Sequence, residues 1–490
     1  MSKHIAMLCI SPNSGGAETH IYELAKELRR EGNDVTVFSK GGVDISSLEE
    51  ADVRHINAPL HSKSPFAIIR SYFILLKEFK KNRPSVVHSH SALVPRMVCR
   101  RLRIPLVASD IKSPIIQTAA EATVIYNDAI NRLRPIDYII SGYYGKNNFG
   151  DDLTLHGLMN HLKDYRGTVL TCDPQNTAVP PNVELIHRFD LWKIRKAMRS
   201  SKVFLFGSGS ILQDSTSNRS VFYYYFIMKM ALRYHCKTML YANGIGPLTK
   251  SSNRKNVARI LKRIDLITLR DEDSLKLLKE LQPNRNAFLT QDDAFSYNVQ
   301  SIPAISAPAQ AQGKTIVGVN FKFKNDQDPK IKDIAEALQV LAQKHQLYYY
   351  LIPYHSLQDI RPLRALHNEL KNCSELAAKA DNPESIIAHA AGCEYQIVER
   401  LHGQIISTML AQPFLPIDYD PKTKAFAAQT GMSTYRIHHN DLEKNRLVEN
   451  FEKIMDQRKD ISARLSEFSK KAKKDAALNR EHLYQIIKDI

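Results

Sequence analysis

Short apolar segments alternate with amphipathic segments along most of the chain. In the amphipathic segments apolar residues recur every three or four positions, which is the spacing of one helix face, and the short segments between them are typical of buried strands. Strands and helices in this alternation predict parallel sheets. In the first third the expected strands are Ile5–Ile10, Asp34–Ser39, Ser85–His88 and Ile104–Ala108, and the expected helices are Ala17–Arg30 and Pro65–Lys81.

The alternation weakens between Lys112 and Pro135 and then resumes, so we place a domain boundary there. A later segment rich in Pro, Ala, Ser and Gln, Ser296–Gly313, is typical of a linker between domains. The charged end of the chain carries Leu, Ile and Phe at helical spacing. The strands expected around the linker are Ile136–Ser141, Thr168–Cys172, Lys202–Gly207, Thr238–Ala242 and Leu266–Arg270 before it, and Thr315–Phe321, Tyr348–Ile352, Gln396–Val398 and Phe414–Ile417 after it.

The chain of 490 residues is too long for one core, since single cores rarely grow past about 250–300 residues. We therefore expect an α/β protein with parallel sheets, made of an N-terminal Rossmann-like half domain and two further Rossmann-like domains. The expected boundaries are 1–120, 136–298 and 314–440, followed by a helical tail at 441–490.

The net charge of +17 suggests an anionic partner, such as a phosphate, a nucleic acid or an acidic membrane surface. An excess of surface lysine on a soluble enzyme explains the charge equally well. No zinc-finger, RRM-like or helix-turn-helix signature is visible, so we expect no nucleic-acid partner.

The six cysteines show no CxxC spacing and no Cys/His cluster, which favours free thiols in a reducing compartment and no metal site. No signal peptide is visible, and the most apolar stretch, Val221–Leu232, is shorter than the roughly 20 residues of a membrane span. We therefore expect a cytoplasmic protein that touches a membrane at most from the side.

Two glycine-rich loops follow expected strands. Gly207, Ser208, Gly209 and Ser210 would expose backbone N–H groups and two hydroxyls, which forms a nest for a phosphate or carboxylate, although a flexible turn has the same composition. Asp214 and Arg219 follow shortly after this loop. The earlier loop, Gly142–Asp152, opens a helix with Asn148 and Asp151, which are either substrate-binding residues or helix caps.

Candidate cationic side chains follow five other strands, at the sheet edge where open α/β sheets bind ligands. Arg270 can hold a carboxylate or phosphate through two parallel hydrogen bonds, or it can pair with Asp271 or Asp273. Arg and His two residues apart can converge on one anion while the His acts as acid or base. The remaining candidates of this kind are Arg400, His402, His355 (with Asp359), Lys322 and Lys422.

The segments GYYGKNNFGDD, GSGSILQD, YANGIGPL, ITLRDEDS, ERLHG and YDPK occur in one order between residues 136 and 430. In this combination the chain resembles the polysaccharide pyruvyl transferases. The resemblance implies phosphoenolpyruvate as co-substrate, no cofactor, and transfer of pyruvate to a sugar diol of a cell-surface or exopolysaccharide glycan, either free or lipid-linked. It also implies that Arg270, Arg400 and His402 bind phosphoenolpyruvate. We take His402 or His355 as the acid and Gly207–Ser210 as the phosphate nest.

The first 110 residues carry a second resemblance. SGGAETHIYELAKELRREGNDVTVFS and VVHSHSALVPRMVCRRLRIPLVASD resemble the N-terminal half of family 4 glycosyltransferases of the GT-B fold, so we expect a GT-B-like architecture. The donor-binding half of that family, with its paired glutamates, does not follow. The segment thus resembles an acceptor-side Rossmann domain without its own sugar-nucleotide site. On the strength of this resemblance, the alternative function is a sugar-nucleotide-dependent glycosyltransferase in surface polysaccharide assembly.

More than half of the net charge lies between His61 and Pro105, where ten Lys and Arg face one acid, Glu78. The expected helix Pro65–Lys81 in this segment is both basic and rich in apolar residues. It either docks on an anionic inner membrane leaflet or packs on a core with its basic side in solvent.

Overall fold

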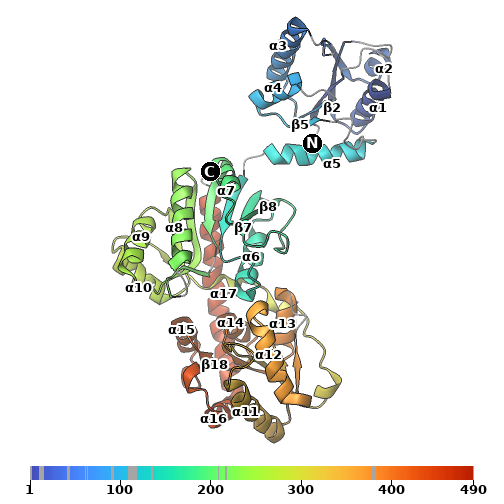
Figure 1. The fold of residues 1–490 in the computed structure, drawn as a ribbon. Helices are drawn as coiled ribbons and strands as arrows, with labels where there is room; N and C mark the ends of the chain where they lie inside the picture. Colours follow the sequence, from blue (N-terminus) through green and yellow to red (C-terminus); the bar gives the residue numbers. More distant parts are fainter. Residues whose placement is uncertain are drawn as a thin grey trace. The chain divides into compact units, whose positions relative to one another are not determined.

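The computed structural model describes residues 3–9, 16–40, 45–60, 62, 64–89, 93–108, 118–133, 136–207, 209–215, 218–377 and 382–488. Contacts divide the chain into two units, Met1–Arg134 and Pro135–Ile490. The first unit contains one parallel sheet and the second contains two, with helices between the strands (Figure 1). The expected α/β class with parallel sheets is confirmed.

The first unit has a five-stranded sheet in the order β3-β2-β1-β4-β5. One helix of this unit, α5, was not predicted, because its segment lacks a clear apolar period; its Ala119, Ala122 and Tyr126 nevertheless complete the core. The motif Ser14–His20 lies partly outside the described residues. The elements are β1 (His4–Leu8), α1 (Gly16–Arg30), β2 (Asp34–Ser39), α2 (Ile45–Glu50), β3 (Arg54–Asn57), α3 (Pro65–Lys81), β4 (Val86–Ser89), α4 (Leu93–Leu102), β5 (Leu106–Ala108) and α5 (Ala119–Leu133).

Helix α3 has the bounds that its apolar spacing predicted. It packs on the sheet with Leu75 and Phe79, which are buried, so the helix faces a core. Its other side nevertheless exposes Phe66, Ile69 and Phe73. The expectation that α3 packs on a core is therefore confirmed, while docking on a membrane stays a prediction.

The second unit begins with a sheet in the order β13-β12-β11-β9-β6-β7-β8, and β10 adds to β11. Its inner strands are buried apolar runs, which is why the sequence revealed them. The elements are β6 (Ile136–Ser141), α6 (Phe149–His161), β7 (Gly167–Thr171), β8 (Val183–His187), α7 (Leu191–Ser200), β9 (Ser201–Phe206), β10 (Gly209–Leu212), α8 (Asn218–Arg233), β11 (Lys237–Ile245), α9 (Ser251–Leu261), β12 (Leu266–Leu269), α10 (Glu272–Leu281) and β13 (Phe288–Leu289).

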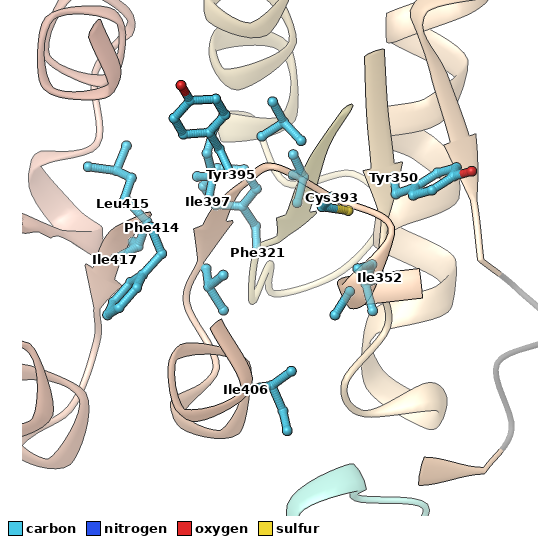
Figure 2. Packing of buried hydrophobic residues seen from close by; sticks show 14 of the residues in the cluster. Phe321, Tyr350, Ile352, Cys393, Tyr395, Ile397, Ile406, Phe414, Leu415 and Ile417 are labelled. Carbon is cyan, nitrogen blue, oxygen red and sulfur yellow. The ribbon is translucent and has the colours of Figure 1, made fainter. Parts of the chain in front are cut away.

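The third sheet has the order β16-β15-β14-β17-β18-β19. Figure 2 shows part of its core, in which apolar side chains of β17, β18 and α14 gather in one cluster. The elements are β14 (Thr315–Asn320), α11 (Lys330–His345), β15 (Leu347–Leu351), α12 (Ser356–Leu370), β16 (Ser374–Leu376), α13 (Pro383–Ala391), β17 (Tyr395–Val398), α14 (Leu401–Met409), β18 (Phe414–Asp418), α15 (Pro421–Gln429), β19 (Ile437–His438), α16 (Lys444–Asp456) and α17 (Arg458–Lys488).

The segment Ser296–Gly313, read as a linker, forms short 3-10 turns, and Ile305 donates its backbone N–H to Ala388 on the domain of the third sheet. The last helix, α17, returns to the domain of the second sheet. Its Leu483 and Ile486 belong to the same buried cluster as the strand residues of β6. The side chain of Asn479 joins it to the loop after β13.

None of the helices in the described part of the chain has an apolar stretch long enough to cross a bilayer.

Candidate active site

A cavity of about 200 Å³ lies between the two domains of the second unit, at the carboxyl ends of their strands. Both domains contribute to its wall. Ser210, Arg270 and Asp292 come from the domain of the second sheet, and Leu401 and Lys422 come from the domain of the third sheet. The crevice outside the carboxyl ends of parallel strands is the usual ligand site of open α/β sheets.

Arg270 follows β12 and is almost completely buried. Its guanidinium donates to the Asp292 carboxylate at 2.7 Å and to the Ser210 hydroxyl at 3.0 Å. Asp271 lies farther away, at 3.6 Å from the Nε atom. Asp292 is therefore the nearest partner, and Asp271 adds the ion pair that the alternative expected. The hydrogen bond to Ser210 ties Arg270 to the loop Gly207–Ser210.

His402 lies in the first turn of α14, with its Nε2 atom 3.8 Å from an Asp292 carboxylate oxygen. This nitrogen is buried and makes no hydrogen bond with the described residues. Burial lowers the pKa of His402 to about 4, against the opposing charge of Asp292. The imidazole is therefore neutral near pH 7. Gly150 of α6 makes room for it, since a Cβ atom at this position would lie 1.8 Å from the His402 ring.

Lys422 lies in the first turn of α15, and the helix is capped by the Asp420 carboxylate, which accepts from the backbone N–H of Lys422 at 3.1 Å. Burial and, to a smaller extent, the nearby positive charge of Arg270 together lower the pKa of Lys422 to about 8. Lys422 and Arg270 therefore place two positive charges on one cavity wall. An arriving anion would neutralise their mutual repulsion.

Asp151 is buried in the first turn of α6. Its carboxyl accepts a hydrogen bond from the Asn148 side chain at 2.6 Å. Burial raises the pKa of Asp151 to about 8, with a further contribution from Asp152, while Arg270 and Lys422 act in the opposite direction. Asp151 thus carries a proton near pH 7. Asn148 does not cap the helix with its side chain; it holds Asp151 instead.

The glycine-serine loop joins β9 to β10, so its second half is a strand and not a flexible turn. Gly207 packs against the Tyr144 hydroxyl, and a Cβ atom added at Gly207 would lie 1.8 Å from this hydroxyl. Gly209 has a φ of 122°, which an L side chain rarely adopts, and the Asp151 carboxyl lies close to it. Ser208 lies outside the described residues.

A second cationic cluster lies at the ends of β14, β15 and β17. Arg400 donates to the buried Asp359 carboxylate at 2.5 Å, and the Asp359 carboxylate also accepts from the backbone N–H of His355 at 3.0 Å. Burial lowers the pKa of His355, and the positive charge of Arg400 adds to this effect. The Lys322 ammonium lies 3.9 Å from the centre of the Tyr419 ring, and burial and Arg400 lower its pKa as well.

The segment Arg400–His402 contributes to both groups of side chains, because His402 lies beside Asp292 at the cavity and Arg400 binds Asp359 in the second cluster. Two other predicted residues, Asp214 and Arg219, lie elsewhere. Asp214 accepts from the backbone N–H groups of Thr249 and Lys250 and from the Asn253 side chain, and so it fixes the start of α9. These hydrogen bonds outweigh its partial burial and lower its pKa to about 2. Arg219 is exposed in the first turn of α8. Neither residue lines the cavity.

The sequence reasoning missed two buried carboxylates, Asp292 and Glu399. Asp292 follows the short strand β13 in the segment Gln291–Asp293, and this strand of two exposed residues carries no apolar pattern to mark it. Glu399 is fully buried and accepts from the backbone N–H of Lys322 at 2.6 Å and pairs with His439 at 2.8 Å. For Glu399 the available signal was an acidic residue directly after a strand, whereas Asp292 lies three residues after β13 and had no such signal.

Two Rossmann-like domains with cations facing a common cavity define a two-domain α/β protein with a candidate site for an anion. Comparison with protein families identifies residues 148–421 as Polysaccharide pyruvyl transferase and residues 14–110 as Glycosyltransferase Family 4. The chain belongs to the polysaccharide pyruvyl transferase family, which places it among the transferases that act on glycans. Both expected resemblances are confirmed.

Solved structures with low sequence identity align with most of the chain. A crystal structure of UDP-N-acetylglucosamine 2-epimerase aligns with a TM-score of 0.50 and 12% identity, over 71% of this chain and 95% of that chain. A putative UDP-N-acetylglucosamine 2-epimerase from Listeria monocytogenes aligns with a TM-score of 0.49 and 9% identity, over 72% and 95%. The expected GT-B-like fold class is confirmed. No curated protein matches the chain in sequence.

Proposed function

We propose that this protein transfers pyruvate from phosphoenolpyruvate to two hydroxyl groups of a cell-surface glycan, forming a cyclic ketal and releasing phosphate. The observation that carries the proposal is the cavity between the two domains, where Ser210, Arg270 and Lys422 face one another in a chain of the pyruvyl transferase family. Phosphoenolpyruvate carries a carboxylate and a phosphate, so its binding requires several cations and N–H groups in one place.

The glycine-serine loop and the two cations suit the phosphate. In this proposal the phosphate takes the place of the Asp292 carboxylate as a partner of Arg270 and accepts from Ser210 and Lys422. Asp151 supports this arrangement because a protonated carboxyl beside the loop does not repel the anion. Arg400 releases the Asp359 carboxylate and binds the carboxylate of the donor instead.

The reaction then needs one acid and one base. An acid protonates the methylene carbon, the neighbouring carbon is attacked by one hydroxyl, the bond to phosphate oxygen breaks, and the second hydroxyl closes the ring. The two hydroxyls lose two protons in total. One of them compensates for the proton that the new methyl group gains, and the other leaves with phosphate. We assign the acid to His402. Its imidazole is neutral in the free protein, and the negative charge of the donor raises its pKa towards the protonated form.

His355 is the weaker candidate for the acid. It lies beside Arg400, whose positive charge opposes protonation, and it is held by its backbone to Asp359. We therefore place it as a residue that shapes the loop next to Asn148, with which it forms an isolated antiparallel bridge.

The cavity volume separates this proposal from the alternative of a glycosyltransferase. Pockets for larger ligands measure roughly 300–1,000 Å³, and the cavity measures about 200 Å³. That size suits a compact donor such as phosphoenolpyruvate. The residues 14–110 then serve the acceptor, as the family 4 segment lacks the donor-binding half.

The test is an assay of the purified full chain with phosphoenolpyruvate, or with sugar nucleotides, and a panel of free and lipid-linked glycans. Phosphate release and a pyruvyl gain in acceptor mass are the expected results. Arg400→Ala and His402→Ala should each lower kcat/KM by about 10²–10³-fold, whereas the exposed Arg361→Ala should not. Mass gain from a sugar nucleotide alone would refute the proposal, and unchanged turnover in both variants would refute the assignment of the two residues.

A further inference from the structure

Helices α7 and α8 cover one face of the second sheet and leave a groove of about 530 Å³ between them. Both helices already bury an apolar side in the core, through residues such as Ile194 and Met198 of α7 and Ile227 of α8. The groove lies on their other side. It is therefore not a part of the core that the fold needs.

The groove and its rim expose large apolar side chains. Trp192 is 76% exposed, Phe222 is 66% exposed and Leu191 is 47% exposed, and Phe226 lies in the groove itself. Trp192 is the single tryptophan of the chain. Large apolar side chains that cluster on a surface mark an interaction site.

The same two helices are strongly basic. Together they contain seven Lys and Arg and no Asp or Glu. Three of the basic residues, Arg195, Lys229 and Arg233, line the groove. Lys193 of α7 forms an ion pair with Asp190, and neither of these two residues lines the groove. The surface is thus a positively charged ring around exposed aromatic and aliphatic groups.

We propose that this α7–α8 surface docks the protein on an anionic lipid bilayer. Tryptophan and long basic side chains favour the boundary between headgroups and acyl chains, since their apolar parts enter it and their polar ends stay in water. The excess of positive charge is complementary to anionic headgroups. A second copy of this chain would bring the same positive surface and be repelled. The proposal does not depend on the chemistry of the cavity.

The single tryptophan allows a direct test with the full-length protein. Vesicles of phosphatidylglycerol and phosphatidylcholine in equal amounts should bind the protein, shift Trp192 emission to shorter wavelength and, when the lipid is brominated, quench it. Vesicles of phosphatidylcholine alone should bind weakly. Arg195→Glu with Arg233→Glu should weaken binding at least about 30-fold, because each basic residue near an anionic surface contributes roughly a factor of five.

Two matched variants separate this surface from others. Phe66→Ser with Phe73→Ser removes the exposed apolar side of α3, and Val340→Ser removes an exposed apolar residue of α11. Neither should change the Trp192 response. Absence of binding to the anionic vesicles overturns the proposal. Binding that leaves Trp192 emission unchanged also overturns it. So does an emission shift that grows with protein concentration in the absence of lipid, because that shift would indicate self-association.

Discussion

Asp151→Asn should make the protein more stable, and increasingly so as the pH rises. The buried carboxyl has a pKa of about 8 in the folded protein against an ordinary value of 3.8. Asparagine has nearly the shape of the protonated acid, and it can still accept the hydrogen bond that Asn148 donates at 2.6 Å. The variant therefore keeps the contacts and removes the ionisation.

The size of the effect follows from proton linkage. Between these two pKa values the folded protein holds a proton that the unfolded chain has released, so stability falls as the pH rises, by about 1.4 kcal/mol per pH unit. Below pH 3.8 both states are protonated and the contribution is fully present; above about pH 8 it is lost. Between pH 6 and pH 8 the free energy of unfolding of Asp151→Asn should therefore gain about 2–3 kcal/mol relative to the natural sequence.

Urea unfolding at pH 6, 7 and 8, followed by far-UV circular dichroism, measures this difference. Asp214→Asn is the matched control: that carboxylate has a pKa lowered to about 2 by its hydrogen bonds, so the variant should be less stable by an amount that does not change between pH 6 and pH 8. If Asp151→Asn and the natural sequence show the same pH dependence, Asp151 is ionised in the folded protein and the electrostatic account of the cavity is wrong.

Three further predictions concern packing and charge near the cavity. Gly150→Ala should displace the His402 ring and lower kcat/KM for ketal formation by about 10²-fold, whereas Gly157→Ala in the same helix, whose Cβ would lie 3.6 Å from its nearest neighbour, should not; equal activities would contradict the clash. Asn479→Leu should lower the free energy of unfolding by about 1–3 kcal/mol in urea titrations, because the Gln291 carbonyl loses the Asn479 donor while the Thr290 hydroxyl keeps the Leu269 carbonyl as its acceptor, and a change below about 0.5 kcal/mol would show that the contact contributes little. The reaction of Lys422 with trace acetic anhydride should follow an apparent pKa of about 8, and an apparent pKa near 10 would show that burial does not lower the pKa of this ammonium.

The parallel sheets could be predicted because buried strands leave a direct trace in the sequence. The segments of β9 and β14 are apolar runs between helical periods, and their bounds were expected to within a few residues. Strands β10 and β13 left no such trace, since the first begins with Gly-Ser and the second has only two exposed residues. The hydrophobic pattern of a segment does not predict a strand that forms only because a neighbouring strand supplies hydrogen-bond partners.

The site was predictable in its cations and not in their partners. Arg270 follows a strand, and this position alone indicated a ligand. Its partner Asp292 lies 22 residues later, and the hydroxyl of Ser210 lies 60 residues earlier. Their proximity depends on the order of the strands in the sheet. The approach of His402 to Gly150 depends further on the contact between two domains, which neither segment encodes by itself.

The return of α17 to the domain of the second sheet has a consequence for biosynthesis. Leu483 and Ile486 complete an apolar cluster whose strand members, such as Tyr138 and Ile140, are translated much earlier. The nascent domain therefore carries an unfilled apolar surface until α17 has been translated, and nascent chains with exposed apolar surface are prone to aggregate. Loss of Leu483 and Ile486 would thus damage the domain of the second sheet and leave the domain of the third sheet, whose core cluster does not contain them, with its core complete.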